Sequence, residues 1–494
     1  MQPLLTAEEI RSLESGWINK TGSKLSLELM EKAGSALADL AKKYPEPYLI
    51  VCGKGNNGGD GIVATRYLME AGKTTFLILT SNEDNLTNDA KVNFEKIKSK
   101  VNHSRVDSGN EEEFINCLER SNTIIDCILG TGAGRGLSDL YKNLVKKIND
   151  SGKIIIACDV PTGIDPTNGT TNGFAIKANV TATIGYPKLG LVVYPAKKFT
   201  GEIKVINIDL PAFNANSYLL DDDFVIKNLP KRYSDAHKGS FGRTLLVAGS
   251  KKYPGAAILA GRAASSIGSG LTSIASYGDV LRNYAPEIPE ITHVDFNLDT
   301  IIDECKKSSV VVIGPGLTTD NEILKIVNEL ILNIDVPIVL DADGINVLSS
   351  EKKVIKSAKK ETILTPHPKE FARLLGITTN EVLSNKVKLV RETSSSLNST
   401  IVLKGPATLI GTKQGTIFVS PFANAALAKG GTGDVLSGFI GGLIAQGLSP
   451  EIAACVGVYI HGKTGEIISK EKTVFSLLPQ DLIKYLPMAL KTFV

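Results

Sequence analysis

Residues 429–434 read Lys429-Gly430-Gly431-Thr432-Gly433-Asp434, and the apolar run Val435 to Leu443 follows directly. The apolar run predicts a buried helix that places Asp434 at or just inside its N-terminus. Glycines there let backbone N–H groups converge on an anion, which the helix dipole also attracts. A carboxylate beside a bound phosphate can take the proton from an attacking hydroxyl. The stretch predicts phosphoryl transfer with Asp434 as base, and a glycine-capped helix without function is the structural alternative.

The composition predicts a globular protein of several domains. The chain has 494 residues, 43% of them hydrophobic, and a formal net charge of +3. This length allows two or three domains, at roughly 150 residues each. The sequence has no cluster of basic residues with interleaved aromatic residues, so nucleic-acid binding is not expected. It also has no apolar run long enough to span a bilayer and no basic leader. Six scattered cysteines predict buried reduced thiols, four of them in strands. We expect a cytoplasmic protein without a nucleic-acid or membrane partner.

The first half begins with a strand, a glycine-rich loop and a helix. Tyr48 to Cys52 is a short buried strand, followed by the run Gly53-Lys-Gly-Asn-Asn-Gly-Gly-Asp-Gly61 and by a helix expected to start near Ile62. The glycine spacing satisfies the dinucleotide fingerprint, but no acid closes the second strand, Thr75 to Leu79. An ordinary NAD-dependent dehydrogenase and a Walker A loop are therefore disfavoured. The run predicts a phosphate-cradling turn, with a purely structural tight turn as the alternative.

Two further apolar strands carry Asp126 and Asp159 near their carboxyl ends. The glycine-rich loop 130–136 follows the first of these strands, and Thr162 follows the second. Open parallel sheets bind their ligands at this edge. Two acids, an asparagine side chain and a threonine could together supply oxygen ligands to a monovalent cation. Each acid alone could equally cap a loop, but together they indicate a functional site.

Residues 1–212 resemble the NAD(P)H-hydrate epimerase family, through the run 53–61 and Asp159-Val-Pro-Thr-Gly-Ile-Asp165. The resemblance implies a Rossmann-like three-layer αβα domain that interconverts the R and S epimers of hydrated NAD(P)H at the hydroxylated C6 of the nicotinamide ring. It implies Asp159 as the acid/base and K⁺ held by Asn57, Asp126 and Thr162, where Thr162 replaces a common serine and keeps the hydroxyl. The residues implied to bind substrate are Asn56, Asn57, Gly58, Gly59, Asp60, Gly130, Thr131, Gly132, Ala133, Gly134, Arg135 and Gly136.

A second α/β domain is expected after residues 211–220, where the periodicity is lost before the acidic run 221–223. Strands again alternate with helices. The expected strands end at Gly314-Pro-Gly316, at Asp341 and Asp343, at His367 and Glu370, and at Lys404. Lys404 is positioned to meet nucleotide phosphates, whereas His367 alone could be structural. We predict domains at 1–212 and 220–494.

The second half resembles the ribokinase-like superfamily over residues 225–494. The runs 367–370 and 429–434 are similar to its ADP/ATP-dependent NAD(P)H-hydrate dehydratase branch, in which the substrate hydroxyl is phosphorylated and then eliminated as phosphate. The resemblance implies Asp434 as base. Glu370 stands where sugar kinases carry a glutamate that orders Mg²⁺, although His replaces their Asn. The residues implied to face the hydrate are Gly316, His367, Pro368, Lys369, Glu370 and Arg373. Those implied to bind the nucleotide are Lys404, Gly405, Pro406, Ala407, Thr408, Asn424, Lys429, Gly430, Gly431, Thr432 and Gly433.

Together the two halves predict one pathway, in which an epimerase feeds a dehydratase that accepts only the S epimer of hydrated NADH or NADPH. The fused arrangement resembles bacterial members, which use ADP, so we expect ADP rather than ATP as donor, and we expect a homo-oligomer. One alternative is a vitamin-precursor kinase of the same superfamily, which leaves the first half without a task. Another is an N-terminal binding scaffold like those of mRNA-decapping assemblies, against which the presence of Asp126 and Asp159 argues.

Overall fold

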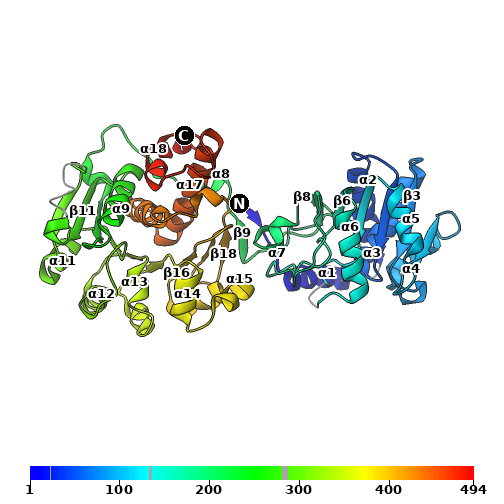
Figure 1. Cartoon of the computed structure of the whole chain (residues 1–494), viewed down its shortest axis with the longest axis horizontal. Helices are drawn as coiled ribbons and strands as arrows, with labels where there is room; N and C mark the ends of the chain where they lie inside the picture. Colours follow the sequence, from blue (N-terminus) through cyan, green and yellow to red (C-terminus); the bar gives the residue numbers. More distant parts are fainter. Residues whose placement is uncertain (23, 133–135, 281–287) are drawn as a thin grey trace. The chain divides into compact units, whose positions relative to one another are not determined.

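The computed structural model describes residues 1–22, 24–132, 136–280 and 288–494 (Figure 1). The chain divides into two compact units. The first unit is Pro3–Ser217, and the second is Tyr218–Val494 together with Met1–Gln2. Each unit has its own sheet covered by helices.

The first unit is built on a sheet in the order β4-β3-β2-β5-β6-β7-β8, in which every neighbouring pair is parallel. Its strands are β2 (Tyr48–Cys52), β3 (Thr75–Leu79), β4 (His103–Arg105), β5 (Thr123–Cys127), β6 (Ile154–Cys158), β7 (Val180–Ile184) and β8 (Glu202–Ile206). The strand order reverses between β2 and β5, so a ligand crevice is expected at their carboxyl ends.

Helices cover both faces of this sheet. They are α1 (Ala7–Thr21), α2 (Lys24–Ala41), α3 (Asn56–Glu70), α4 (Asn88–Glu95), α5 (Glu112–Arg120), α6 (Asp139–Asp150) and α7 (Leu189–Val192). Ile50 belongs to a core cluster with residues of α2, α3 and α4, whereas Leu49 and Val51 belong to a separate one with residues of α5 and α6. Figure 1 shows α2 and α3 packed together. The predicted three-layer αβα architecture is confirmed.

The glycine-rich run after β2 is helical, and the expectation of a helix start near Ile62 was wrong. α3 begins at Asn56 with Gly55 as its N-cap. A Cβ on Gly58 would lie 1.8 Å from the carbonyl oxygen of Gly53, and one on Gly59 would lie 2.5 Å from Cε of Met30. These glycines therefore let the first turns of α3 pack closely on the end of β2 and on α2.

All six cysteines are free and buried, as predicted. Three of them, Cys52, Cys127 and Cys158, lie in the adjacent strands β2, β5 and β6. The other three, Cys117, Cys305 and Cys455, lie in helices, so the prediction of four in strands was wrong. An apolar neighbourhood alone does not separate a buried helix from a buried strand.

The second unit contains a sheet in the order β1-β9-β18-β17-β16-β15-β14-β13-β10-β11-β12. The strands from β16 to β12 pair in parallel, whereas β17 pairs antiparallel with β16 and with β18. The bounds are β1 (Gln2–Pro3), β9 (Ser217–Leu219), β10 (Arg243–Val247), β11 (Leu271–Ser276), β12 (Thr292–Asp295), β13 (Val310–Ile313), β14 (Ile338–Leu340), β15 (Thr362–Leu364), β16 (Thr400–Leu403), β17 (Leu409–Gly411) and β18 (Ile417–Val419).

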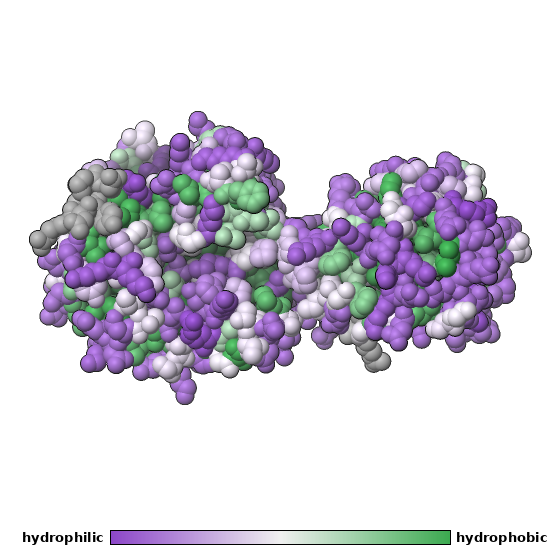
Figure 2. Space-filling model, viewed as in Figure 1, coloured by the Kyte–Doolittle hydropathy of each residue, from purple (hydrophilic) through white to green (hydrophobic). Residues whose placement is uncertain are grey.

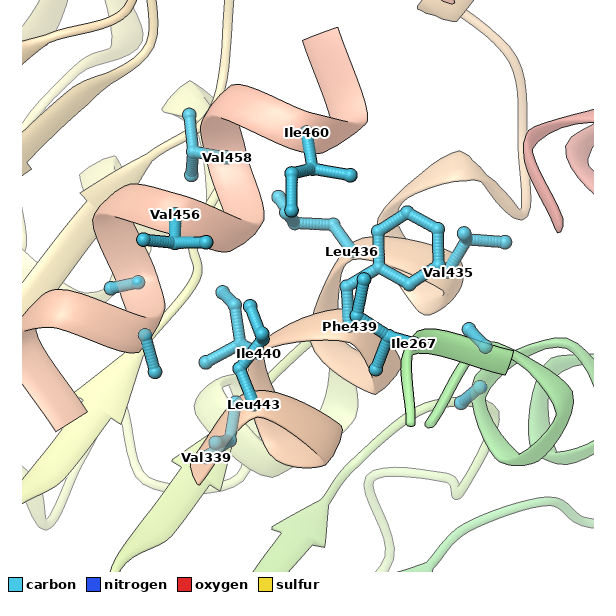
Figure 3. Packing of buried hydrophobic residues seen from close by; sticks show 14 of the residues in the cluster. Ile267, Val339, Val435, Leu436, Phe439, Ile440, Leu443, Val456, Val458 and Ile460 are labelled. Carbon is cyan, nitrogen blue, oxygen red and sulfur yellow. The ribbon is translucent and has the colours of Figure 1, made fainter. Parts of the chain in front are cut away.

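The helix predicted after the glycine run is the centre of this unit. α16 (Thr432–Ala445) is almost entirely buried, and Asp434 is its third residue. Figure 3 shows Val435 and Phe439 of α16 beside Ile267 of α9, and Leu443 beside Val339 of β14. The other helices are α8 (Asp222–Asn228), α9 (Pro254–Ile267), α11 (Leu298–Cys305), α12 (Asn321–Asn333), α13 (Asp343–Asn346), α14 (Pro368–Leu375), α15 (Thr379–Leu397), α17 (Pro450–Glu471) and α18 (Pro479–Leu490).

Polar residues dominate the visible surface of both units. Figure 2 shows hydrophilic residues over most of the drawn face, with apolar residues in scattered patches. Among the residues that the structure describes, no helix combines the length and the apolar character needed to cross a bilayer.

Candidate active sites

A cavity of about 660 Å³ in the first unit is lined by residues that follow β2, β5 and β6. It therefore lies where the strand order reverses. It brings together seven predicted residues, namely Asn56, Asn57, Asp60, Gly130, Thr131, Gly132 and Asp159. Gly58 and Gly59 are buried within α3 and do not line the cavity, and neither does the exposed Gly136. Ala133, Gly134 and Arg135 lie outside the described residues.

Asp159 is held in the cavity wall by a lysine that the sequence reasoning missed. Lys188 is 1% exposed and forms an ion pair with the Asp159 carboxylate. Its ammonium also donates to the carbonyl oxygen of Ile184 at 2.8 Å, and the N–H of Ile184 donates to Oδ1 of Asp159 at 3.0 Å. Asp159 has a left-handed backbone with φ of 63°. Such a conformation in a non-glycine residue is typical of functional sites.

Two other carboxyl groups line the same cavity. Asp60 of α3 is 8% exposed, and its pKa lies well above the usual range because of burial, to which the negative charges of Asp159 and Glu14 add. Burial also raises the pKa of Glu14 on α1, although the Lys188 charge opposes this shift. The cavity thus combines a carboxylate paired with lysine and two carboxyl groups whose pKa values are raised.

The predicted cation ligands lie around the end of β5. The Asp126 carboxylate accepts from the hydroxyl of Thr162 at 2.7 Å and from its N–H at 2.8 Å. Burial raises the pKa of Asp126 to about 6, although these hydrogen bonds oppose the shift. The side-chain oxygen and nitrogen of Asn57 are buried without a hydrogen-bond partner in the described chain. A buried orphan amide is uncommon, and a bound cation would satisfy its oxygen.

The second unit places Lys404, Asp341 and Gly433 together. Asp341 follows β14 and is 1% exposed, and its Oδ1 accepts from Nζ of Lys404 at 2.6 Å. A Cβ on Gly433 would lie 3.1 Å from Nζ of Lys404. The ammonium therefore lies beside the first turn of α16, where an anion would bind. Sequence reasoning noticed Asp341 at a strand end but gave it no role.

Asp434 lines a cavity of about 390 Å³ with Gly316, Asp343 and Tyr253. Burial raises the pKa of Asp434 to about 7, with a further contribution from the negative charge of Asp341 and an opposing one from Lys404. A general base works best when its pKa lies near the working pH. The arrangement is suited to proton abstraction beside an anion site at neutral pH.

The glycine run is anchored from the protein interior. Gly431 is the N-cap of α16 with φ of 95°, a conformation that favours glycine. The hydroxyl of Thr432 donates to the carbonyl oxygens of Leu427 and Lys429, both at 2.9 Å. Nε2 of the buried His461 donates to the carbonyl oxygen of Thr432 at 3.0 Å, and burial lowers the pKa of His461 to about 4. A neutral histidine thus holds the first turn of α16.

Two predicted nucleotide ligands are turned toward the protein. Lys429 donates to the carbonyl oxygens of Phe475 at 2.7 Å and Leu477 at 2.6 Å. The amide nitrogen of Asn424 donates to Gly465 and Ser469, both at 2.8 Å. These side chains hold the run 424–433 in place. Of the run 404–408, Gly405 and Pro406 are exposed, Ala407 is buried, and the hydroxyl of Thr408 donates to the carbonyl oxygen of Gly405.

Of the six predicted hydrate-facing residues, all except Gly316 lie in α14 or at its N-cap, His367. The Glu370 carboxylate accepts from the N–H of His367 at 2.8 Å, while Nδ1 of His367 accepts from the N–H of Lys369 at 3.1 Å. Pro368 is the first residue of the helix, and Arg373 bonds to Asn346 of α13. The negative charge of Glu370 raises the pKa values of Lys404 and Asp434, but none of these α14 residues lines the cavity that holds Asp434 and Gly316.

The two sites define a two-domain α/β enzyme with a Rossmann-like unit and a phosphoryl-transfer unit. A family described as YjeF-related protein N-terminus matches residues 26–190, and one described as NAD(P)H-hydrate dehydratase matches residues 244–488. The chain is 34% identical to the bifunctional NAD(P)H-hydrate repair enzyme Nnr of Thermofilum pendens, over 98% of this chain and 95% of that protein. It is 35% identical to the enzyme of the same name in Coxiella burnetii, over 98% and 99% of the two chains. The chain belongs to the family of bifunctional NAD(P)H-hydrate repair enzymes.

Solved structures match the second unit. An ADP/ATP-dependent NAD(P)H-hydrate dehydratase from Bacillus subtilis, co-crystallised with ATP and Mg²⁺, is 34% identical with a TM-score of 0.51, covering 57% of this chain and 100% of its own. A ribokinase-like superfamily protein from Enterococcus faecalis is 26% identical with the same TM-score, covering 57% and 99% of the two chains. The predicted family and the ribokinase-like fold are confirmed.

Proposed function

We propose that the chain repairs hydrated NADH and NADPH in two steps. The first unit interconverts the R and S epimers, and the second dehydrates the S epimer to NAD(P)H at the expense of ADP, giving AMP and phosphate. One observation carries the proposal, namely that a single chain holds both the Asp159 cavity and the Asp434 site at the start of α16. The names of relatives that span nearly the whole chain support it.

In the second unit, Asp434 takes the proton from the C6 hydroxyl of the substrate, and the hydroxyl oxygen then attacks the terminal phosphorus of the nucleotide. The backbone N–H groups of Gly430 to Gly433 and the ammonium of Lys404 stabilise the negative charge that develops there. The C6–O bond then breaks with its electrons on the departing phosphate, which takes the proton of the neighbouring ring carbon, and the C–H electrons restore the double bond. The stabilisation of the phosphoryl group requires the Lys404 ammonium to lie next to Gly433, and Nζ of Lys404 does lie beside that glycine.

Mg²⁺ accompanies the nucleotide in this proposal. Magnesium commonly binds through one or two carboxylates, water and substrate phosphates. The buried carboxylates of Glu370 and of Asp341, the partner of Lys404, fit that need, although both already accept hydrogen bonds within the protein. The ion would neutralise charge on the phosphates. The co-crystallisation of the Bacillus subtilis dehydratase with ATP and Mg²⁺ together supports the pairing.

In the first unit, Asp159 moves the proton during epimerisation, with Lys188 fixing its carboxylate. We assign K⁺ to the oxygens of Asn57, Asp126 and Thr162, because the buried Asn57 amide lacks a partner among the described residues. The ion would supply positive charge at the substrate-binding edge. We place the enzyme in the cytoplasm, which its free thiols support. A homo-oligomer stays a prediction.

The test is an incubation of the full chain with both epimers of hydrated NADH and with ADP. Absorbance at the reduced-nicotinamide band should rise until both epimers are consumed, and AMP should form in equal amount. A rise that stops when the S epimer is exhausted would contradict the epimerase assignment. No rise with either ADP or ATP would contradict the dehydratase assignment.

A vitamin-precursor kinase is the second candidate, favoured by the ribokinase-like fold and the Asp434 site. It would leave a stable phosphate ester on a hydroxymethylpyrimidine or thiazole alcohol and would form no NADH. A first unit that acts only as a binding scaffold would give no turnover of the R epimer.

A further inference from the structure

The cavity of the first unit contains two buried carboxyl groups with different surroundings. Asp159 has the ammonium of Lys188 beside it. Asp60 is equally buried, and its side-chain carboxyl group makes no hydrogen bond or ion pair within the described ranges. Its position is fixed by the close packing of the preceding Gly58 and Gly59 in α3. A polar group that is buried, unpartnered and exposed only to a cavity is placed to meet a ligand.

The proposed epimerisation needs two proton-transfer groups. In the hydrate, C6 carries a hydroxyl and is bonded to the ring nitrogen N1. Breaking the C6–N1 bond opens the ring, and this step removes a proton from the hydroxyl oxygen and delivers one to the ring nitrogen. A single carboxylate can serve the oxygen, but the departing nitrogen needs an acid at the same moment. Enzymes commonly supply such a pair by giving two carboxyl groups environments that separate their pKa values.

We propose that Asp60 is the acid partner of Asp159 in the epimerisation, an inference that rests on the proposed function. Asp159 takes the hydroxyl proton, the C6–N1 bond breaks as C6 becomes an aldehyde, and N1 takes the bond electrons and the proton of Asp60. The aldehyde rotates about its bond to C5. N1 then attacks the opposite face of C6 as Asp60 recovers its proton and Asp159 returns one to oxygen. Atoms and protons balance, and no other reactant is required.

Burial and the neighbouring negative charges raise the pKa of Asp60, which favours the protonated form that this role requires. Glu14 is the competing acid, because it lines the same cavity and its pKa is also raised. However, Glu14 is only partly buried and lies on α1, whereas Asp60 is part of the tightly packed start of α3. This favours Asp60 as the acid.

The experiment uses the full chain with ADP and with each epimer supplied separately. Consumption of the R epimer reports epimerisation, and consumption of the S epimer reports the second unit. Asp60→Asn keeps the size of the side chain but removes the proton, so kcat for the R epimer should fall by about 10²-fold or more, with KM within about threefold of the wild type. The rate with the S epimer should be unchanged. Asp84→Asn, on an exposed residue outside the cavity, is the matched control.

An R-epimer rate within threefold of the wild type in Asp60→Asn would overturn the inference, and so would a rise in KM alone, which indicates binding only. A loss of rate in Glu14→Gln with none in Asp60→Asn would overturn it in favour of Glu14. If the Asn variant does not fold, Asp60→Glu decides, because it retains a carboxyl group. A rate above about a tenth of wild type supports the acid role, and a lower rate contradicts it. A wild-type chain that leaves the R epimer untouched would instead refute the proposed function.

Discussion

Nζ of Lys404 lies 2.6 Å from Oδ1 of Asp341, and the two residues follow strands β16 and β14 that are separated in the sheet by β15. The hydroxyl of Thr365, which follows β15, donates to the same oxygen at 2.7 Å. Three successive strand ends are therefore joined through one buried carboxylate. This arrangement fixes the ammonium of Lys404 beside the start of α16. The stability of the second unit and its proposed anion binding therefore both depend on the Lys404–Asp341 pair.

Lys404→Met should destabilise the second unit by about 3 kcal/mol or more, because it leaves the Asp341 carboxylate buried without its charge partner. Urea unfolding measures the loss. The double variant with Asp341→Asn removes the unpaired charge and should regain most of the stability, but it should not regain dehydration. Equal stability in Lys404→Met and the wild type would show that the pair is not a significant structural contact.

Asp434→Asn should reduce dehydration of the S epimer by about 10² to 10⁴, the usual loss for a general base. Because the pKa of Asp434 is about 7 and the base must be ionised, activity should fall as the pH falls through 7. The expected loss is about tenfold between pH 8 and pH 6. A flat pH profile or full activity in the Asn variant would exclude Asp434 as the base.

ADP should be the preferred donor, so dehydration should release AMP. Chromatography of the nucleotides after turnover with either donor distinguishes the products. Strong turnover with ATP and none with ADP would reverse the prediction, while the requirement for Asp434 should hold with both.

Asp159→Asn should abolish epimerisation while the S epimer is still consumed. Lys188→Met should also impair epimerisation, since it removes the ammonium that fixes the Asp159 carboxylate. Both rates can be measured in one preparation by supplying each epimer with ADP. An unchanged R-epimer rate in Asp159→Asn would remove this residue from the mechanism.

The two units should fold and work separately, because each has its own hydrophobic core clusters. Residues 1–212 and 220–494, expressed as separate chains, should epimerise and dehydrate respectively. Circular dichroism tests folding and the two epimer assays test activity. Failure of both pieces to fold would contradict the two-domain architecture.

The sequence predicted the regular parts of the fold well. The strands 48–52 and 75–79 match β2 and β3 residue for residue, because a short run that is apolar throughout, or apolar after its first residue Thr75, is typical of a strand buried on both faces. The start of α3 was not predicted because glycine disfavours helices. Gly58 and Gly59 are tolerated there because they pack closely on Gly53 and Met30, and this packing cannot be read from the local sequence.

The site could be predicted only in part. Residues at strand ends, such as Asp126, Asp159 and Asp341, carry a local signal. Lys188 carries no such local signal, because its role depends on an ion pair with Asp159, which lies 29 residues earlier in the chain. The inward orientation of Lys429 depends on carbonyl groups of residues 475 and 477, which local spacing cannot reveal.

The three adjacent thiols of β2, β5 and β6 give the first unit an internal probe of its own stability. Burial raises the pKa of Cys127, and for Cys158 the hydrogen bond with Cys127 and then burial do the same. Only a thiolate reacts readily with alkylating reagents. These cysteines should therefore be modified only when the central strands separate. The rate of alkylation then measures the frequency with which the sheet opens.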